Sequence, residues 1–587
     1  MLTGVIIVNH MLIMLYLIYL NRCHMKNYLN KNKYLKYLII IDLILCIFLF
    51  TKGIPVGQDL SYHLSRIDGL TNSIRSGNFL GYIHFVSGLP KSINVNNMAA
   101  MINENMGNYG YANGLFYGNL FLYLPAILSL LGLSVIISYK ILIVILMLLT
   151  SLIMYYVTDK IFNNKRVAFI SSLLYTTCSY HMTDVVIRAA LGEILAYMLV
   201  PLTLLGLYYI LFDDKKKWYI FPISFFLLVN SHLITSFMMV IIYLFIIIFN
   251  IRRLFKEKRF KYLVYSILLG TLLSSFFIFP LIEQLLSDKF VLNNLSLLPS
   301  ERALPIYKVL LGIRFNFYIY DIEFIPAGIG LLFIIPLFFI KKVKENKFIK
   351  ICMITGLISL LCVTNIFPWK YFDKVFSFIQ FPWRFYLPAT LFLSFSSAYI
   401  LNYIIKSKKG FKYLTIYTVL IGFIITFQAF IGLKYTIEDT HDYFYISSGE
   451  YLPLKSVPIN LDNKFVTSSD DIKYYVRKRD LEVYLNYYNG NNGYIDVPMF
   501  YYKGYEARSL LTNELYKIEK GNNNLIRINL KDKDKVRLYY KGTITQKVSL
   551  VISLITVTTL LIIYYRKNKD RIITNYLYIK YNRRVHK

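Results

Sequence analysis

Three side chains suited to acid–base or phosphate chemistry stand close together just after a hydrophobic segment at residues 37–53. They are Asp59, His63 and Arg66. Their spacings of four and three residues place them on one face of a helix, so the sequence predicts a charged cluster at the membrane surface. Such a cluster suits chemistry on a lipid headgroup. It equally suits a solvated amphipathic helix whose charges only keep it flat on the membrane.

Further polar side chains are expected on the same side of the membrane, at a second outer turn, an outer hairpin and the end of an outer loop. In chain order they are Asp184, Arg188, Glu193, His232, Trp383 and Arg384. Polar groups at membrane depth are costly and usually face a cavity or a partner. Arginine can bind a phosphate through paired hydrogen bonds, and a nearby carboxylate can take a proton from a hydroxyl. For each residue alone, snorkelling or helix capping remains an equal alternative.

Composition places the chain among membrane proteins. Of its 587 residues, 56% are hydrophobic and 17% aromatic, whereas soluble proteins average about 45–50% apolar residues. Several windows of about 18–20 nearly uncharged residues are long enough to cross a hydrocarbon core of roughly 30 Å. The net charge of +32 comes from 65 basic and 33 acidic residues. Its densest runs lie between hydrophobic segments, which indicates cytoplasmic loops rather than a nucleic-acid-binding surface. The five cysteines lie in or near hydrophobic segments and indicate no external disulfide framework.

The basic linkers predict the topology. They lie at residues 21–36, 159–166, 213–217, 252–261, 341–350 and 406–412, and in the tail from Arg566. All become cytoplasmic if the chain crosses thirteen times, with the N-terminus outside and the C-terminus inside. The expected spans are 4–20, 37–53, 137–157, 166–180, 194–212, 217–231, 233–250, 262–283, 324–340, 348–366, 383–405, 412–433 and 547–565. Residues 116–134 are also apolar, but an extra span there would export basic residues, so we expect a surface-lying or re-entrant helix.

The outer regions differ in character. Residues 54–136 form a long first loop, and residues 434–546 show little helical periodicity. Within the second region, residues 482–488, 494–502, 525–530 and 536–540 alternate like half-buried strands, and Asn489-Gly490 is typical of a turn. The sequence therefore predicts an all-α polytopic membrane protein with a small extracytoplasmic β-rich domain. The expected domains are 1–433 (transmembrane, including loop 54–136), 434–546 (β-sandwich-like) and 547–587 (a final transmembrane helix and a basic cytoplasmic tail).

Signatures of soluble enzymes are missing from the sequence. There is no Walker loop, no dinucleotide-binding glycine pattern, no paired CxxC and no HExxH. Asp213-Asp214 lies beside three lysines and Asp470-Asp471 follows two serines, so both pairs are interpreted as loop and turn residues. No metal ligand is predicted.

Several motifs together resemble the GT-C glycosyltransferase superfamily. They are Gly57-Gln58-Asp59 with His63 and Arg66, Tyr111-Ala-Asn-Gly-Leu-Phe-Tyr-Gly-Asn, Arg188-Ala-Ala-Leu-Gly-Glu193, Gln380-Phe-Pro-Trp-Arg-Phe385, Gly449-Glu-Tyr-Leu-Pro453 and Tyr501-Tyr-Lys-Gly-Tyr505. More narrowly, the chain resembles the YfhO-like bacterial membrane proteins and a related group called pyruvoyl-tetrahydropterin-synthase-related membrane proteins, over nearly its whole length.

This resemblance implies a polyprenyl-phosphate-sugar donor, transfer outside the bacterial plasma membrane, and an acidic residue of the first outer loop at the active centre. Asp59 is the matching position. The chain departs from the family pattern in two ways: an additional hydrophobic segment precedes the helix that leads to Asp59, and no second acidic residue adjoins it. The resemblance therefore leaves use of a divalent metal open.

The leading hypothesis is a membrane glycosyltransferase that modifies an envelope glycopolymer or glycolipid. Asp59 would act as the base or as an acid that orients the acceptor. Arg66, Arg188 and Arg384 are candidates for holding the donor phosphate, and His63 and Glu193 are candidates for positioning. The other expected substrate-binding residues are Asp184, His232 and Trp383. One alternative is a transporter or flippase for a lipid-linked glycan, for which Asp42 is the clearest charge within a span. The other is an assembly protein whose β-rich domain binds wall polymer.

Overall fold

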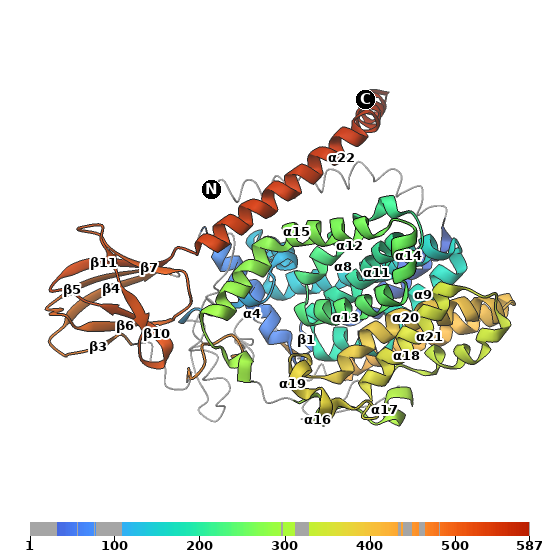
Figure 1. The fold of residues 1–587 in the computed structure, drawn as a ribbon, viewed down its shortest axis with the longest axis horizontal. Coiled ribbons are helices and arrows are strands. Elements are labelled where there is room, and N and C mark those ends of the chain that lie inside the picture. The colour runs from blue at the N-terminus through green and yellow to red at the C-terminus, as the bar shows by residue number, and fades with distance from the viewer. Residues whose placement is uncertain are drawn as a thin grey trace.

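The structure is a computed structural model, and it describes residues 32–55, 57–75, 77, 109–294, 298–311, 328–431, 436–437, 449–456, 464–479 and 482–585. Within these residues, helices form one large body, and strands β3 to β11 form a smaller part at one end of it (Figure 1). The first expected span, 4–20, and residues 78–108 of the first outer loop lie outside the described residues. The chain is mostly helical with a small β-rich part, and this coarse prediction is confirmed.

Six helices among the described residues are long and apolar enough to cross a membrane. They are α8 (Val135–Phe162), α11 (Leu191–Leu211), α15 (Phe260–Ser287), α20 (Tyr386–Ile404, continuing the turn η10 at Pro382–Phe385), α21 (Lys408–Ile431) and α22 (Ile544–Val585). A rise of about 1.5 Å per residue makes about 20 residues sufficient for the hydrocarbon core. These helices are those of a multi-pass membrane protein.

Five other expected spans fold as shorter helices of 10 to 17 residues. They are α3 (Lys33–Leu45), α9 (Lys165–Thr177), α12 (Ile220–Val229), α13 (Leu233–Phe249) and α18 (Lys347–Val363). Each ends at a polar or turn residue before reaching full spanning length. The count of thirteen spans is therefore not confirmed.

The expected helical span at residues 324–340 is wrong over its described part. Residues 328–330 are irregular, and the chain then forms two 3₁₀ segments, η6 (Leu331–Phe333) and η7 (Ile335–Lys342). Gly330 has a φ of +90° and Pro336 lacks a backbone N–H, so neither residue favours a continuous α-helix here. The hydrophobic run predicted a membrane span here, and these two residues interrupt the α-helix that such a span needs.

The apolar segment 116–134 contains no helix of spanning length. It holds the end of α6 (Asn113–Phe116), the turn η2 (Leu120–Leu122) and α7 (Tyr123–Leu130). An α-helix of 8 residues covers only about 12 Å. Its expected surface-lying or re-entrant position stays a prediction.

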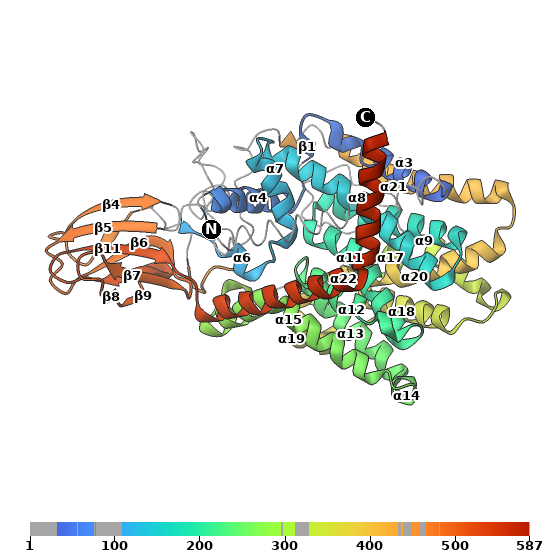
Figure 2. The same ribbon diagram turned by 90° about the horizontal axis from the view of Figure 1, so that it is seen from above.

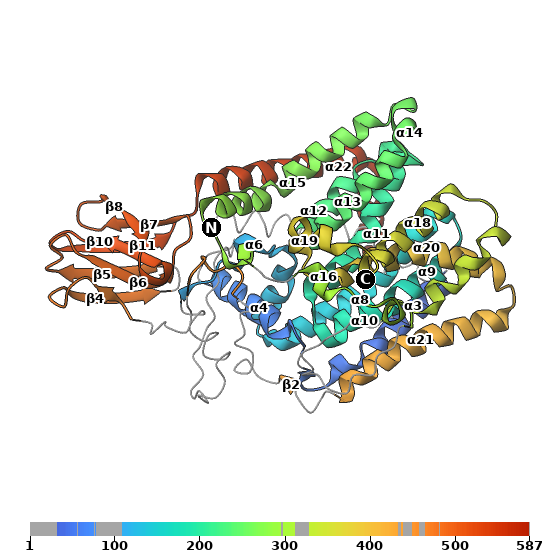
Figure 3. The same cartoon turned by 60° about the horizontal axis from the view of Figure 1, so that its bottom comes forward.

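The described linkers at 159–166, 213–217, 252–261, 341–350 and 406–412 lie toward the end of the helical body away from the sheets of β3–β11, where α14 (Ile251–Lys256) also lies (Figures 1 and 3). Lys215 donates from Nζ to the carbonyl of Glu257 at 2.7 Å, which joins two of these linkers. The Arg166 guanidinium donates to the carbonyl of Ile405, the residue just before the linker at 406–412. This clustering is the arrangement that the positive-inside interpretation requires.

The β-rich part consists of two antiparallel sheets. The first has the order β3 (Val466–Thr467), β6 (Tyr494–Phe500), β10 (Leu525–Asn529), β9 (Ile518–Lys520). The second has the order β4 (Lys473–Arg479), β5 (Glu482–Tyr488), β11 (Asp534–Tyr540), β7 (Tyr505–Ser509), β8 (Leu515–Tyr516). The four strands expected from alternation are therefore present, and Asn489 adopts a left-handed φ of 57° in the turn after β5.

Residues far away in the sequence complete the core of the sheets. Tyr109, Tyr111, Phe116 and Phe290 belong to the same buried cluster as the strand side chains. Phe116 stacks on Tyr451 with ring centroids 4.9 Å apart. The β-rich part is thus joined to the first outer loop by a shared hydrophobic core and not only by its two chain ends.

Helices α15 and α22 lie side by side along the outside of the body (Figure 2). Ser275 and Ser553 share a hydrogen bond of 2.8 Å between their Oγ atoms, and Ser275 also donates to the carbonyl of Ser549. Small polar residues allow such close packing between membrane helices.

The remaining short elements are η1 (Ile47–Phe50), β1 (Ile54–Pro55), η4 (Lys215–Lys217), η5 (Val291–Asn294), α16 (Pro299–Arg302), α17 (Ile306–Leu311), η8 (Trp369–Tyr371), α19 (Asp373–Phe376), η9 (Ser377–Ile379), β2 (Thr436–Ile437) and η14 (Asn522–Asn524).

Candidate functional site

Asp59 stands at the N-terminus of α4 (Leu60–Arg75) and is fixed by its backbone. Its carbonyl accepts from the N–H of His63 at 3.1 Å, and its own N–H donates to the carbonyl of Arg188 at 2.8 Å. A Cβ on Gly57 would stand 2.7 Å from the Cβ of Ala189, so glycine permits this close approach of the two segments. The first outer loop is therefore docked against the expected second outer turn.

That second segment is helical and buried rather than an exposed turn. It comprises α10 (Ser179–Thr183) and the π-helical turn η3 (Asp184–Arg188), and Ala189 then adopts a left-handed φ of 53°. The expected short outer turn at residues 181–193 is thus helical, and its charges pair with one another, which allows them to be buried. Single π-helical turns are rare and often occur at functional sites.

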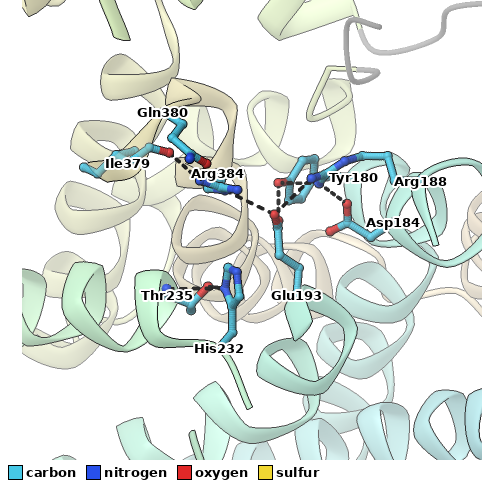
Figure 4. A network of polar contacts seen from close by, with 9 residues as sticks. All are labelled: Tyr180, Asp184, Arg188, Glu193, His232, Thr235, Ile379, Gln380 and Arg384. Atoms are coloured by element: carbon cyan, nitrogen blue, oxygen red, sulfur yellow. Dashed lines mark hydrogen bonds and ion pairs between the residues drawn. The ribbon is translucent and has the colours of Figure 1, made fainter. Parts of the chain in front are cut away.

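A network of ion pairs holds these charges (Figure 4). Arg188 donates to Asp184 at 2.5 Å and to Glu193 at 3.1 Å, and both carboxylates are buried. Tyr180 donates its hydroxyl to the second oxygen of Glu193. Buried charges are stable in a protein when they are paired and hydrogen-bonded in this way.

Arg384 joins the network from η10. Its Nε lies 3.4 Å from Glu193, and its Nη1 donates to the carbonyl of Ile379 at 2.6 Å and to the side chain of Gln380 at 3.0 Å (Figure 4). Gln380 has a left-handed φ of 62°, and this conformation turns the loop toward the arginine. Phe381 stacks on Trp383 with centroids 4.4 Å apart, which packs the same loop.

These segments surround one pocket of about 390 Å³. Seven of the nine side chains expected at a site line it, namely Asp59, His63, Arg188, Glu193, His232, Trp383 and Arg384. Arg66 and Asp184 do not line it. Asp184 lies behind Arg188 as its partner.

Arg66 packs into the wall of the pocket. It is 2% exposed, it donates to the carbonyl of Gly118 at 2.9 Å, and its guanidinium lies 3.9 Å from the ring centroid of Tyr117. The helical spacing correctly placed Arg66 on the same helix as Asp59 and His63. Its guanidinium, however, holds the backbone of residues 117–118 in place rather than facing the pocket.

Burial and neighbouring charges shift the pKa values of the pocket residues that lie outside the membrane-spanning helices. Burial raises the pKa of Asp59, and Arg188 partly offsets this increase. Burial lowers the pKa of His63 well below its ordinary value, and Arg66 and His232 lower it further. Burial also lowers the pKa of His232 to about 4, although Glu193 opposes the change. Both imidazoles are therefore neutral near pH 7.

The sequence did not single out several other lining residues. They are Gln58, Tyr62, Tyr117, Arg302, Gln380, Glu450 and Tyr451. Gln380, Glu450 and Tyr451 lie within motifs that carried the family resemblance, so a signal for them was present. Tyr451 links three regions: its N–H donates to the hydroxyl of Tyr111 at 2.9 Å, and its carbonyl accepts from the hydroxyl of Tyr502 at 3.1 Å. No sequence spacing connects these regions.

The donor set does not favour a metal ion. Both oxygens of Glu193 already accept hydrogen bonds, from Arg188 and Tyr180. Among the described residues, no group of three or more histidine, cysteine, aspartate or glutamate side chains has the geometry of a metal site. Asp59 and Glu450 are the other carboxylates that line the pocket, and they form no such group among the described residues, so we derive no step through a metal.

No protein-family model and no curated protein matches the chain. Among solved structures, it is similar to the arabinofuranosyltransferase AftD from Mycobacteria, with a TM-score of 0.38 and 13% identity over 68% of this chain and 27% of that one. It is also similar to the oligosaccharyltransferase AglB from Archaeoglobus fulgidus, solved with an inhibitory peptide and a dolichol-phosphate. There the TM-score is 0.33 and the identity 13%, over 73% of this chain and 61% of that one. The chain thus spans less than two thirds of either protein.

Proposed function

We propose that this protein is a membrane glycosyltransferase of GT-C type that moves a sugar from a polyprenyl-phosphate donor to a glycopolymer or glycolipid of the cell envelope. One observation carries the proposal: the pocket contains both a carboxylate and arginines. The carboxylate, Asp59, forms no ion pair among the described residues, and Arg188 and Arg384 are held in place by their ion pairs with Glu193. Both TM-scores lie below 0.5, so the proposal rests on this pocket and on the sequence motifs. It places the reaction at the outer face of a bacterial plasma membrane.

Asp59 has the environment of a general base. Its raised pKa makes the carboxylate a stronger proton acceptor than an ordinary aspartate. In the proposed step, the acceptor hydroxyl oxygen bonds to the anomeric carbon of the donor sugar while Asp59 takes the hydroxyl proton. The bond from the anomeric carbon to the phosphate oxygen breaks, and polyprenyl phosphate leaves with the electron pair.

The leaving phosphate gains negative charge, so a cation must face it. Arg188 is already paired with Asp184 and Glu193, which makes it the least suitable of the pocket arginines. Arg384 shares Glu193 at the longer distance of 3.4 Å. Arg302 is exposed at the end of α16 and lines the same pocket. We assign the phosphate to Arg384 and Arg302.

A translocation path is less well supported. Asp42, the charge that favoured a transporter, is 1% exposed and accepts a hydrogen bond from the hydroxyl of Ser151. It therefore has a local partner and does not line the pocket. The other charges gather in one place rather than along the helices.

The test is direct transfer of sugar. Membranes containing the wild-type protein are incubated with a panel of radiolabelled polyprenyl-phosphate sugars and envelope fractions, and label in the acceptor is measured. Label that depends on the wild-type protein and is lost in Asp59→Asn supports the proposal. If no donor gives label above that of membranes lacking the protein, the glycosyltransferase assignment fails.

A further inference from the structure

A neutral cluster of three aromatic polar side chains, His63, Tyr117 and His232, lies within the pocket beside the ion pairs. The ring centroid of Tyr117 is 6.2 Å from that of His63 and 6.2 Å from that of His232. All three side chains line the pocket, and they come from α4, from the segment after α6 and from the residue before α13. Burial raises the pKa of Tyr117 to about 12, so its hydroxyl keeps its proton near pH 7.

The hydrogen bonds of His232 fix which ring nitrogen carries the proton. His232 is the N-cap of α13, and its side chain accepts from the backbone N–H of Thr235. A backbone N–H can only donate, so Nδ1 must be the acceptor. The hydroxyl of Thr235 lies 2.7 Å from the same Nδ1 (Figure 4). A neutral His232 therefore carries its proton on Nε2.

His63 reaches the same state through a different partner. Its Nδ1 lies 3.5 Å from Nη1 of Arg66, and a guanidinium has donors only. Nδ1 of His63 is thus the acceptor, and Nε2 carries the proton. Arg66, which packs outside the pocket lining, has a clear role in this arrangement: it sets the tautomer of a histidine that does line the pocket.

We propose that His63 and His232 are a pair of fixed Nε2–H donors that bind uncharged oxygen atoms of a sugar, its hydroxyls or its ring oxygen. Neither histidine then acts as the acid or base of the reaction. This inference rests on the proposed function for its ligand, and it extends that function by placing the sugar at the neutral cluster. The bound sugar belongs either to the lipid-linked donor or to the glycan acceptor. The KM values for the two substrates distinguish these cases.

Matched substitutions separate a donor role from a structural one at His232. Glutamine places an amide N–H near the position of Nε2 but cannot cap α13. Asparagine keeps a capping oxygen near the position of Nδ1 but removes the distant donor. If His232 donates to the sugar, H232N should raise KM by roughly 3- to 10-fold, and H232Q should raise it less. If His232 is only a cap, H232Q should be the less stable and the less active variant, and the proposal is overturned.

The same comparison applies at His63. H63N keeps an acceptor for Arg66 and H63Q keeps a donor toward the pocket, so H63N should again have the larger KM. An increase in KM for the polyprenyl-phosphate sugar places the contact on the donor, whereas an increase for the envelope acceptor places it on the acceptor. An equal KM for wild type and both asparagine variants would overturn the assignment.

A measurement that needs no turnover separates this inference from the proposed function. Nitrogen NMR of histidine-labelled protein in nanodiscs, with H63N and H232N used for assignment, should show both residues protonated at Nε2 and uncharged near pH 7, and His232 should stay uncharged down to about pH 5. Addition of each polyprenyl-phosphate sugar of the panel, then of the envelope acceptor fraction, should shift these Nε2 signals for at least one sugar. Shifts without any sugar transfer would support the binding site and refute the enzyme. Protonation at Nδ1, or no shift with either probe, would refute the binding site.

Discussion

Asp59 differs from Asp184 and Glu193 because it forms no ion pair with Arg188, and the hydrogen bond between Asp59 and Arg188 joins their backbones. Replacing it with asparagine keeps the size of the side chain and removes its basicity. A positioned general base contributes about 10²- to 10⁴-fold in rate, so Asp59→Asn should reduce sugar transfer by roughly that factor. Folding should survive, because burial already disfavours the charged form of Asp59. Initial rates at matched protein levels provide the measurement.

The control for this variant comes from the same helix. Asp68 lies on α4 away from the pocket lining, so Asp68→Asn makes the same chemical change outside the site. Leu60 is nearer to Asp59 but fully buried, and shortening it would cost about 2–5 kcal/mol of stability. Equal loss of activity in Asp59→Asn and Asp68→Asn would argue against a catalytic role for Asp59.

The raised pKa of Asp59 also predicts a pH profile. A base works only when deprotonated, so activity should fall as the pH decreases through the pKa of Asp59. Because burial raises that pKa, the acid limb should lie above the value of about 3.9 for a free aspartate. The pH dependence of kcat/KM reports this group in the free enzyme. A profile that stays flat down to the range of a free aspartate would contradict the assignment.

The two paired arginines should respond differently to substitution. Arg188→Met leaves Asp184 and Glu193 buried with less positive charge, and removing one partner of a buried pair costs about 3–5 kcal/mol. Arg384→Lys keeps a charge but loses the planar geometry, so it should reduce transfer by about tenfold or more while the protein stays folded. Thermal unfolding in detergent and transfer rates compare the two. Equal unfolding temperatures with equal rates would show that neither arginine has its assigned role.

At the scale of elements, the first turn of α11 packs against the segment that carries Tyr117. A Cβ on Gly192 would lie 1.7 Å from the hydroxyl of Tyr117. Gly192→Ala should therefore destabilise the protein by about 1–3 kcal/mol. Tyr117→Phe removes the clashing oxygen, so the double variant should recover part of this loss. Unfolding temperatures of the four proteins in this cycle give the coupling, and additive effects would contradict the contact.

The helices and strands were predictable from the sequence wherever one hydrophobic pattern, an apolar run or an alternation, continues through the element. The long apolar runs became α8, α11, α15, α20, α21 and α22, and the alternating residues became β5, β6, β10 and β11. Prediction failed where local residues interrupt a pattern, as Gly330 and Pro336 do in the region of η6 and η7. It also failed at 181–193, where burial of charges depends on pairs such as Arg188 with Glu193. The sequence around either residue alone does not show that an ion pair will balance its charge in the folded protein.

At the scale of the whole molecule, the β-rich part and the basic linkers are predicted to lie on opposite sides of a membrane. Lys517 lies exposed in the β-rich part, and Lys344 lies exposed among the basic linkers. In a variant without Cys23, whose other cysteines are buried, Lys517→Cys should react with an impermeant thiol reagent in intact cells. Lys344→Cys should react only after the cells are opened. Reaction of Lys344→Cys in intact cells would reverse the predicted orientation.

The candidate site was predictable in its residue types but not in its assembly. Most of the charged and aromatic residues singled out by type do line one pocket, because hydrophobic surroundings make such residues costly unless they serve a site. Glu450 and Tyr451 were missed as lining residues, because they approach the pocket only through the packing of Phe116, Tyr111 and Tyr502 around Tyr451. Contacts of this kind depend on the complete fold.

The position of Tyr451 has a consequence for biosynthesis. The ribosome makes Asp59, Arg188 and Arg384 long before it makes Glu450 and Tyr451, so the nascent chain inserts most of its helices with one side of the pocket still missing. Tyr502, whose hydroxyl donates to the carbonyl of Tyr451, is made later still. Under the proposed function, we therefore expect a partly made chain to be inactive and the pocket to form only after the β-rich part has been made.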